Sequence, residues 1–223
     1  MGTDAAENPQ RRAGRPAIPV LTRERIAAAA VRRLQDTDPD HLRMADLADD
    51  LGVRPSSLYN HVRGRAELLN LVRDHLAGDF DTEALLRQPW TEALEAWARS
   101  YIASFARLHP SATAAIAVLD MGEQPTVMSM YERFCDLMLS VGWPDDQVMP
   151  TLLALESFCV GTAQELRAPH GYMRPTSPEA TPTYHRLYRA GTEVSRQAAD
   201  LGLSIFIAGL DQRLATILST QGD

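Results

Sequence analysis

Apolar residues recur at helical spacing along most of the chain, and no run alternates between apolar and polar positions as a strand would. In residues 22–35, for example, Ile26, Ala30 and Leu34 repeat every four residues, and Thr22 can cap the first turn. Similar patterns predict helices over residues 43–51, 55–62, 66–76, 90–108, 111–119, 127–140, 145–167, from residue 183, and over about 196–219. The predicted fold class is therefore all-α.

Proline and glycine mark the connections between these segments. Residues 1–20 contain three prolines and no apolar period, which predicts a flexible basic arm. Residues 168–182 contain four prolines and form a loop that is too long to be a simple connector. Pro150 falls in the early turns of the helix expected over 145–167, and we expect it to bend that helix.

Residues 44–62 have the pattern of a helix-turn-helix. Ala48 is small enough for the crossing of two helices, and Gly52 permits a positive φ in the turn. Val53, Leu58 and Val62 would anchor the second helix inward. The outward face of that helix is then Arg54, Ser56, Ser57, Tyr59, Asn60 and His61. Such an acid-free face, rich in hydrogen-bonding groups, suits a phosphate-lined major groove, although an ordinary helical hairpin remains the alternative.

Charge is distributed unevenly along a chain whose net charge is -7. Residues 1–78 hold 12 arginines against 11 acidic residues, whereas residues 79–223 hold 10 against 18. A cationic front on an acidic body suggests that the front meets a polyanion, and the alternative is a solvated surface helix with a loose tail. Arg11, Arg12 and Arg15 could enter a minor groove, but we favour a tail with only diffuse electrostatics.

The composition is that of a globular protein, with 45% hydrophobic and 23% charged residues. We find no apolar run as long as a membrane span, and the polar first ten residues do not suggest a secretory signal. Two cysteines, Cys135 and Cys159, cannot build a disulfide framework or a zinc site. We therefore expect a cytoplasmic protein.

Several stretches resemble the N-terminal domain of TetR-family transcriptional regulators. They are TRERIA at 22–27, MADLADDLGVRPSSLYNHV at 44–62 and ELL at 67–69, with the L-Y-x-H-V core at 58–62 as the most specific part. Sparser landmarks, at Trp90, Gly142-Trp143, 161–165 and 201–210, are similar to the C-terminal domain of the tetracycline-repressor branch. The resemblance implies a helix-turn-helix DNA-binding domain of three helices over 21–66 and a helical effector-binding and dimerisation domain over 67–223.

The resemblance also implies which residues contact DNA. Base edges would face Arg54, Pro55, Ser56, Tyr59 and Asn60, and phosphates would be contacted by Arg43, Ser57, Tyr59, His61 and Arg65. Arg43 and Arg65 stand at expected helix N-termini, where backbone N–H groups already favour an anion. Ala45 and Asn60 depart from the tetracycline repressor, so its operator cannot be carried over. Packing at the end of the helix is the alternative role for Tyr59 and His61.

A small-molecule effector is implied for the C-terminal domain. The residues expected to bind it are Trp97, Tyr101, Met121, Phe134, Phe158, Thr162 and Glu165, with Gln164 as a further polar anchor. By spacing alone these aromatic and methionine side chains are more typical of plain core. Residues 116–118 lack the histidine with which the tetracycline repressor binds its drug's metal ion. We therefore expect a mainly apolar effector and neither a metal nor a cofactor.

Dimerisation has a separate physical argument. Residues 151–163 and 201–218 are apolar on more than one face, so each helix must be covered on several sides. Two such helices from each of two chains would form a four-helix interface, with Ser157, Gly161 and Gly209 permitting close approach. The alternative is that both helices lie centrally in a monomer. The prediction is a homodimeric repressor that binds double-stranded operator DNA of pseudo-palindromic sequence and is released by its effector, with the helix over 66–76 as the lever.

Other functions are less well supported by the sequence. An all-α enzyme could use His109, His170 or His185, but we find no metal-ligand spacing, nucleophile elbow or phosphate loop, and we predict that the protein is not an enzyme. A dimeric scaffold with a relic helix-turn-helix is a third possibility. A thiol sensor built on Cys135 and Cys159 is a fourth, although both lie on apolar helices.

Overall fold

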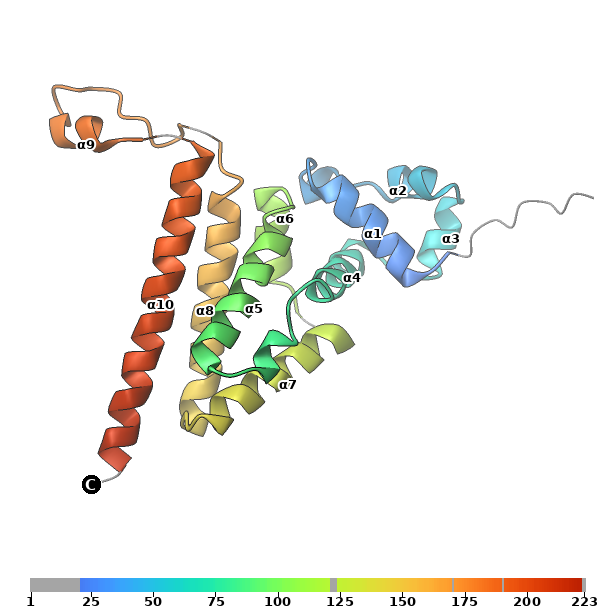
Figure 1. Ribbon diagram of the computed structural model, residues 1–223. Coiled ribbons are helices and arrows are strands. Elements are labelled where there is room, and N and C mark those ends of the chain that lie inside the picture. The colour runs from blue at the N-terminus through green and yellow to red at the C-terminus, as the bar shows by residue number, and fades with distance from the viewer. Residues whose placement is uncertain (1–20, 121–123, 170, 190, 222–223) are drawn as a thin grey trace, which may run out of the picture.

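The computed structural model describes residues 21–120, 124–169, 171–189 and 191–221, and these parts are helical without strands (Figure 1). The all-α prediction is therefore confirmed. The α-helices are α1 Arg23–Leu34, α2 Met44–Leu51, α3 Pro55–Tyr59, α4 Arg65–Ala77, α5 Trp90–Phe105, α6 Pro110–Ala117, α7 Pro125–Ser140, α8 Asp145–Glu165, α9 Pro182–Leu187 and α10 Thr192–Gln221. Two 3₁₀ turns are also present, η1 Pro39–His41 between α1 and α2 and η2 Ala84–Leu86 between α4 and α5.

The first three helices and α4 pack around a small core. The Thr22 hydroxyl caps α1 by accepting a hydrogen bond from the Arg25 N–H at 3.3 Å, and Ile26, Ala30 and Leu34 are fully buried. Helix α1 packs against α2 and α4, and α2 packs against α3. The predicted four-residue apolar repeat of α1 thus covers this core.

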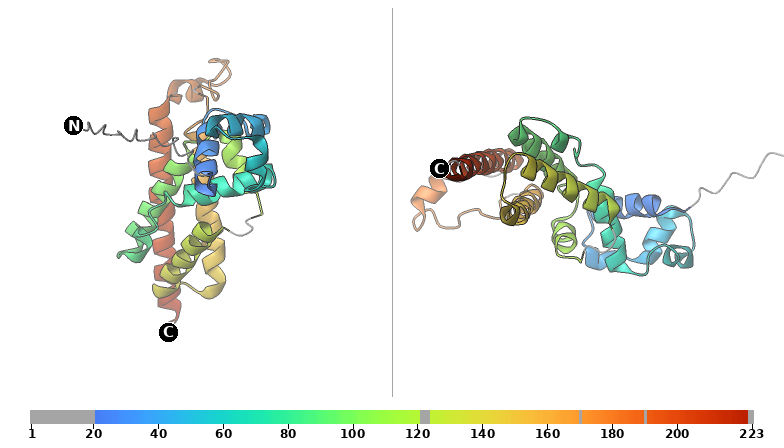
Figure 2. Two further views of the ribbon diagram at one scale, coloured as in Figure 1. Left: turned by 90° about the vertical axis from the view of Figure 1, so that its right-hand side faces the viewer. Right: turned by 90° about the horizontal axis from the view of Figure 1, so that it is seen from below.

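The larger body is a layered bundle in which α5 packs against α8 and α7 packs against α4 and α8 (Figure 2). Trp97 of α5 and Phe134 of α7 meet in its interior with ring centroids 5.7 Å apart, and both side chains are fully buried. Helix α4 contacts α1 as well as α5, α6 and α7, so it belongs to both cores.

Helix α10 runs along one side of the body and contacts α5 and α8. In Figures 1 and 2 it lies at the opposite end of the molecule from α3. Leu203, Ile207 and Leu214 bury its inner face, but most of its surface is exposed. An 18-residue stretch within residues 192–220 has a mean hydropathy of 1.4, so by length and composition alone this helix could cross a membrane. From the sequence we expected no apolar run of that length. One such helix is weak evidence for a membrane span, since apolar helices of soluble proteins meet the same criteria.

Most predicted helix boundaries agree with the structure to within about two residues. The helix expected over 55–62 ends earlier, at Tyr59, and the last helix begins at Thr192 rather than near residue 196. Residues 77–88, for which no element was predicted, include η2. The arm over 1–20 lies outside the described residues.

Candidate DNA-binding surface and effector cavity

The turn between α2 and α3 has the geometry expected of a helix-turn-helix. Gly52 has φ 66° and ψ 34°, in the left-handed region, and its N–H donates to the Asp49 carbonyl at 3.1 Å. Ala48 and Leu58 are fully buried at the crossing, whereas Val53 is only partly buried. A positive φ after α2 and an apolar anchor in α3 together fix the angle at which α3 leaves the domain.

Helix α3 presents its polar side chains outward. Arg54, Pro55, Ser56 and Asn60 are exposed, and the Tyr59 side chain is 53% exposed. Ser57 and His61 are half-buried at the edge of this face. The structure thus gathers the predicted DNA-contacting residues of the recognition helix on one protruding surface without an acidic residue.

The two flanking arginines are each paired with a carboxylate. Arg43, at the N-cap of α2, donates to both Asp46 oxygens at 2.9 Å, and Arg65, the first residue of α4, pairs with Asp40. Both arginine side chains are exposed, at 76% for Arg43 and 42% for Arg65. Exposed ion pairs are weak, so either guanidinium could exchange its partner for a phosphate at little cost.

One further arginine holds the end of α3 in place and was not singled out from the sequence. Arg23 donates to the His61 carbonyl at 2.6 Å and to Glu67 at 3.0 Å. Glu67 also accepts the Arg63 N–H at 2.8 Å. These two contacts lower the pKa of the Glu67 carboxyl, with the Arg63 N–H as the larger cause. The spacing of arginines in residues 11–33 gave no indication that Arg23 turns toward the recognition helix.

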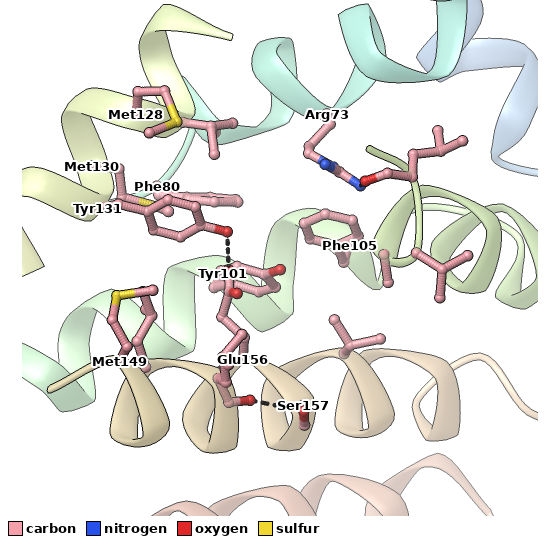
Figure 3. Close-up of a pocket in the computed structure, with 18 of the residues that line it drawn as sticks. Arg73, Phe80, Tyr101, Phe105, Met128, Met130, Tyr131, Met149, Glu156 and Ser157 are labelled. Carbon is pink, nitrogen blue, oxygen red and sulfur yellow. Dashed lines mark hydrogen bonds between the residues drawn. The ribbon is translucent and has the colours of Figure 1, made fainter. Parts of the chain in front are cut away.

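A cavity of about 750 Å³ lies in the C-terminal body, bordered by side chains of α4 to α8 (Figure 3). Its volume is in the range of small-molecule sites. Its wall is largely apolar, and its aromatic, sulfur-containing and polar members are Arg73, Phe80, Tyr101, Phe105, Met128, Met130, Tyr131, Glu132, Cys135, Met149, Glu156, Ser157 and Gln164.

Three aromatic rings cluster in one wall, with the centroids of Phe80 and Phe105 6.2 Å apart. The centroids of Phe80 and Tyr101 are 4.7 Å apart, and those of Tyr101 and Phe105 are 4.9 Å apart with planes only 16° from parallel. Phe80 follows α4, whereas Tyr101 and Phe105 are one turn apart on α5.

Polar groups gather around Glu156 of α8. The Tyr131 hydroxyl of α7 donates to a Glu156 carboxylate oxygen at 2.8 Å, as Figure 3 shows. Burial raises the pKa of the Glu156 carboxyl, and the hydrogen bond from Tyr131 partly opposes this shift. Burial also raises the pKa of the Tyr131 and Tyr101 hydroxyls, and the nearby Glu156 charge adds to both shifts. Glu156 was not among the residues predicted from the sequence.

The predicted effector residues are distributed over several places. Tyr101 borders the cavity, as does Gln164. Trp97 and Phe134 are fully buried behind Tyr101, and Phe158 packs against Phe206 of α10 with ring centroids 5.7 Å apart.

Three other predicted positions do not meet the large cavity. Thr162 is not part of its wall, and Met121 lies outside the described residues. Glu165 borders a separate cavity of about 230 Å³ beside α9, where it accepts the Tyr172 hydroxyl at 2.6 Å. Within the described part of the chain no group of three or more His, Cys, Asp or Glu side chains could hold a metal ion.

Helix α4 connects the cavity to the DNA-binding domain. The Arg73 guanidinium, in the cavity wall, donates to the Ile116 and Leu119 carbonyls at the end of α6. Its neighbour Asp74 accepts the backbone N–H groups of Thr126, at 2.9 Å, and Val127, at 3.2 Å, in the first turn of α7. One helix thus bonds the ends of two cavity-forming helices while its other side packs on α1.

Comparison with known proteins places these features in context. The HTH-type transcriptional repressor DrrR1 of Streptomyces coeruleorubidus is 30% identical over 160 residues, which cover 69% of this chain and 57% of that protein. An HTH-type transcriptional regulator of Saccharopolyspora erythraea is 27% identical, over 65% of this chain and 60% of that protein. The matches therefore span less than two thirds of the length of these curated relatives. No family model matches the chain.

Solved structures give a fuller match. ActR, a TetR family protein of Streptomyces coelicolor, has been solved with actinorhodin, and that structure is 29% identical with a TM-score of 0.67, covering 86% of this chain and 96% of that chain. The ligand-free ActR structure is 27% identical with a TM-score of 0.70, covering 88% and 98%.

A helix-turn-helix with an exposed polar recognition helix, joined by one helix to a cavity-bearing helical body, defines the class of helix-turn-helix transcriptional regulators. Within that class the chain belongs to the TetR family, as its sequence and structural relatives show.

Proposed function

We propose that this protein is a homodimeric transcriptional repressor that leaves its operator when a small molecule fills the cavity. The observation that carries the proposal is the position of α4, which bonds to the cavity-forming helices through Arg73 and Asp74 and packs on the DNA-binding domain. The relatives are named as transcriptional regulators, one of them a repressor, and ActR binds actinorhodin. Because these relatives are transcriptional regulators, they support a regulatory function for this chain rather than an enzymatic one.

The DNA contacts that we propose are those of the α3 face and its flanks. Arg54, Pro55, Ser56, Tyr59 and Asn60 would face base edges in a major groove. Phosphates would be bound by Ser57, Tyr59 and His61 at the edge of that face, and by Arg43 and Arg65 after each gives up its carboxylate partner.

The dimer would form through α8 and α10. Leu201, Ile205 and Leu218 of α10 are between 46% and 63% exposed, and Leu153 of α8, which also borders the cavity, is 58% exposed. Large aliphatic side chains on neighbouring helices favour a buried interface, which would also account for the apolar composition of α10 in a cytoplasmic protein. A Cβ on Gly209 would meet no atom of its own chain within 4 Å, so this position leaves room for a second copy.

Release would follow from the contacts of α4. A ligand that displaces the end of α6 or the start of α7 moves the partners of Arg73 and Asp74, and α4 carries the shift to α1. In a dimer, this changes the separation of two recognition helices that must meet successive major grooves about 34–36 Å apart. A coupling of ~1–3 kcal/mol between the two sites is usual for such regulation.

A selection experiment tests the DNA-binding part of the proposal. The purified full chain is used to enrich a randomised duplex library, and the enriched sequences are expected to be inverted repeats. Tyr59→Ala and Arg54→Ala should weaken binding to those sequences, each by about 1–3 kcal/mol for a base-contacting side chain. Arg186→Ala, which removes an exposed arginine from α9, is the matched control and should bind as the wild type does. Failure to enrich any sequence would overturn the proposal.

A further inference from the structure

The Glu156 carboxylate is the chemical feature of the cavity that the apolar wall does not explain. It lies between α5, α7 and α8, where the Tyr131 hydroxyl donates to it at 2.8 Å (Figure 3). This hydroxyl is a neutral hydrogen-bond donor. The half-buried carboxylate feels the charge of Arg73 but forms no ion pair with it, so its negative charge is only partly compensated, which is an unfavourable arrangement in an apolar site.

The cation in the cavity wall, Arg73, directs its hydrogen bonds away from Glu156. Arg73 directs its Nη2 atom to the Ile116 and Leu119 carbonyls, and the described residues contain no ion pair between Arg73 and Glu156. Figure 3 shows the two side chains on opposite sides of the cavity, with Phe105 and Tyr101 between them. Glu132, exposed at the rim, adds a second carboxylate. Two carboxylates and one guanidinium therefore border the cavity, and this excess of negative charge favours a positively charged occupant.

The surrounding surface is suited to the flat body of such an occupant. The Phe80, Tyr101 and Phe105 rings cluster in the wall beside Glu156, each less than 10% exposed, and the half-exposed Met128 and Met149 line the wall around them. Aromatic faces attract a cation placed over them, and methionine sulfur makes favourable contacts with aromatic rings.

We propose that the effector is a flat aromatic amine whose protonated nitrogen pairs with Glu156 while its ring system lies against the wall formed by the aromatic cluster, Met128 and Met149. This inference rests on the proposed function of the cavity as an effector site, and it adds the charge and shape class of the ligand. Neutral or anionic polycyclic ligands are the competing classes.

Three fluorescent tricyclic probes of similar shape test whether the cavity prefers a positively charged ligand. Proflavine is a cation at neutral pH, acridone is neutral and anthracene carboxylate is an anion. Binding to the full chain without DNA is followed by fluorescence anisotropy. We expect proflavine to bind at least about tenfold more tightly than acridone, and anthracene carboxylate to bind most weakly.

Two variants test whether Glu156 is the group that pairs with the cationic probe. Glu156→Gln keeps an acceptor for Tyr131 and should weaken proflavine binding by about tenfold while leaving acridone within about twofold. Glu132→Gln is the matched control at the exposed rim and should change proflavine binding much less. Circular dichroism verifies that each variant is folded. Equal affinity for proflavine and acridone, or an unchanged proflavine affinity in Glu156→Gln, would overturn the inference.

A cavity-filling variant separates this inference from the proposed function. Val160→Trp places a large side chain in the wall and should abolish binding of all three probes. If acridone binds, is lost in Val160→Trp and is not surpassed by proflavine, the effector site stands and the amine class is wrong. If no probe responds to Val160→Trp, both the effector cavity and the inference fail.

Discussion

Tyr101 and Trp97 lie about one turn apart on α5, yet Tyr101 borders the cavity and Trp97 is buried behind it. The apolar spacing of α5 predicts that both side chains point inward. It cannot tell which of them meets another helix and which meets a cavity, because that depends on where α7 and α8 lie. Glu156 illustrates the converse, since an acidic residue in the apolar middle of α8 gives no sign in the sequence of the two tyrosines near it.

Arg65 allows a prediction about phosphate contacts. If its guanidinium leaves Asp40 to bind a phosphate, Arg65→Ala should reduce the slope of log affinity against log salt by about 1 in operator binding. The slope is measured by titrating salt with wild type, Arg65→Ala and Arg186→Ala. Identical slopes for all three proteins would remove the phosphate role of Arg65.

Glu156 allows a prediction about pH. Burial raises the pKa of its carboxyl above the ordinary value of 4.5, so between the two values the folded chain holds a proton that the unfolded chain has lost. Stability then falls as the pH rises through this window. Glu156→Gln has no such dependence, so its free energy of unfolding relative to wild type should increase as the pH rises above about 4.5.

Urea unfolding between about pH 4 and 8 measures this difference. Tyr101, Tyr131 and Cys159 face the same carboxylate, but their pKa values are raised above their ordinary values, so they do not titrate in this range. If the difference in unfolding free energy between Glu156→Gln and wild type is constant across this pH range, burial does not raise the pKa of Glu156.

At the scale of elements, capping residues, prolines and glycines in the sequence predicted the boundaries of most helices. Thr22 caps α1 as predicted, and His109 caps α6 with Pro110 in its first position. The turn of the helix-turn-helix also follows from one residue, because the positive φ at Gly52 suits glycine. Such features depend on neighbouring residues and are therefore readable without knowledge of the tertiary structure.

Two glycines in the DNA-binding domain make a matched test of the turn. A Cβ on Gly52 or Gly64 would meet no atom within 4 Å, but Gly52 has φ 66° whereas Gly64 has extended backbone with φ 163°. Gly52→Ala should therefore destabilise the fold by about 1 kcal/mol, the conformational cost of the left-handed region. Gly64→Ala should be near neutral. Chemical denaturation measures both, and equal effects would contradict this explanation.

At the scale of the whole molecule, the exposed apolar side of α10 is the feature that a single chain leaves unexplained. Its inner face contributes Leu203, Ile207 and Leu214 to the core, while Leu201 and Ile205 remain more than 60% exposed. The distance between α10 and α3 in Figures 1 and 2 means that a dimer formed through α10 would leave the recognition helices free.

The dimer can be tested by charge insertion. Combining Leu201→Glu and Ile205→Glu should place four carboxylates in a symmetric interface and yield a monomer in size-exclusion chromatography with light scattering. Operator binding should fall sharply, because two half-sites are no longer bound together, while helix content is retained. Leu86→Glu, at a 64% exposed leucine on η2, is the control. A double variant that remains dimeric would show that the interface lies elsewhere.

The sequence by itself determined the all-helical class, the helix-turn-helix with its exposed α3 residues, and the apolar excess of α8 and α10. Each of these depends on local spacing or on single residues with special backbone needs. The tertiary structure decided which side of each helix faces the cavity. It placed Phe158 against α10, Glu165 beside α9 and Glu156 between two tyrosines. Helices that are apolar on several faces do not encode which neighbour covers which face, so these contacts were settled only when all the helices packed together.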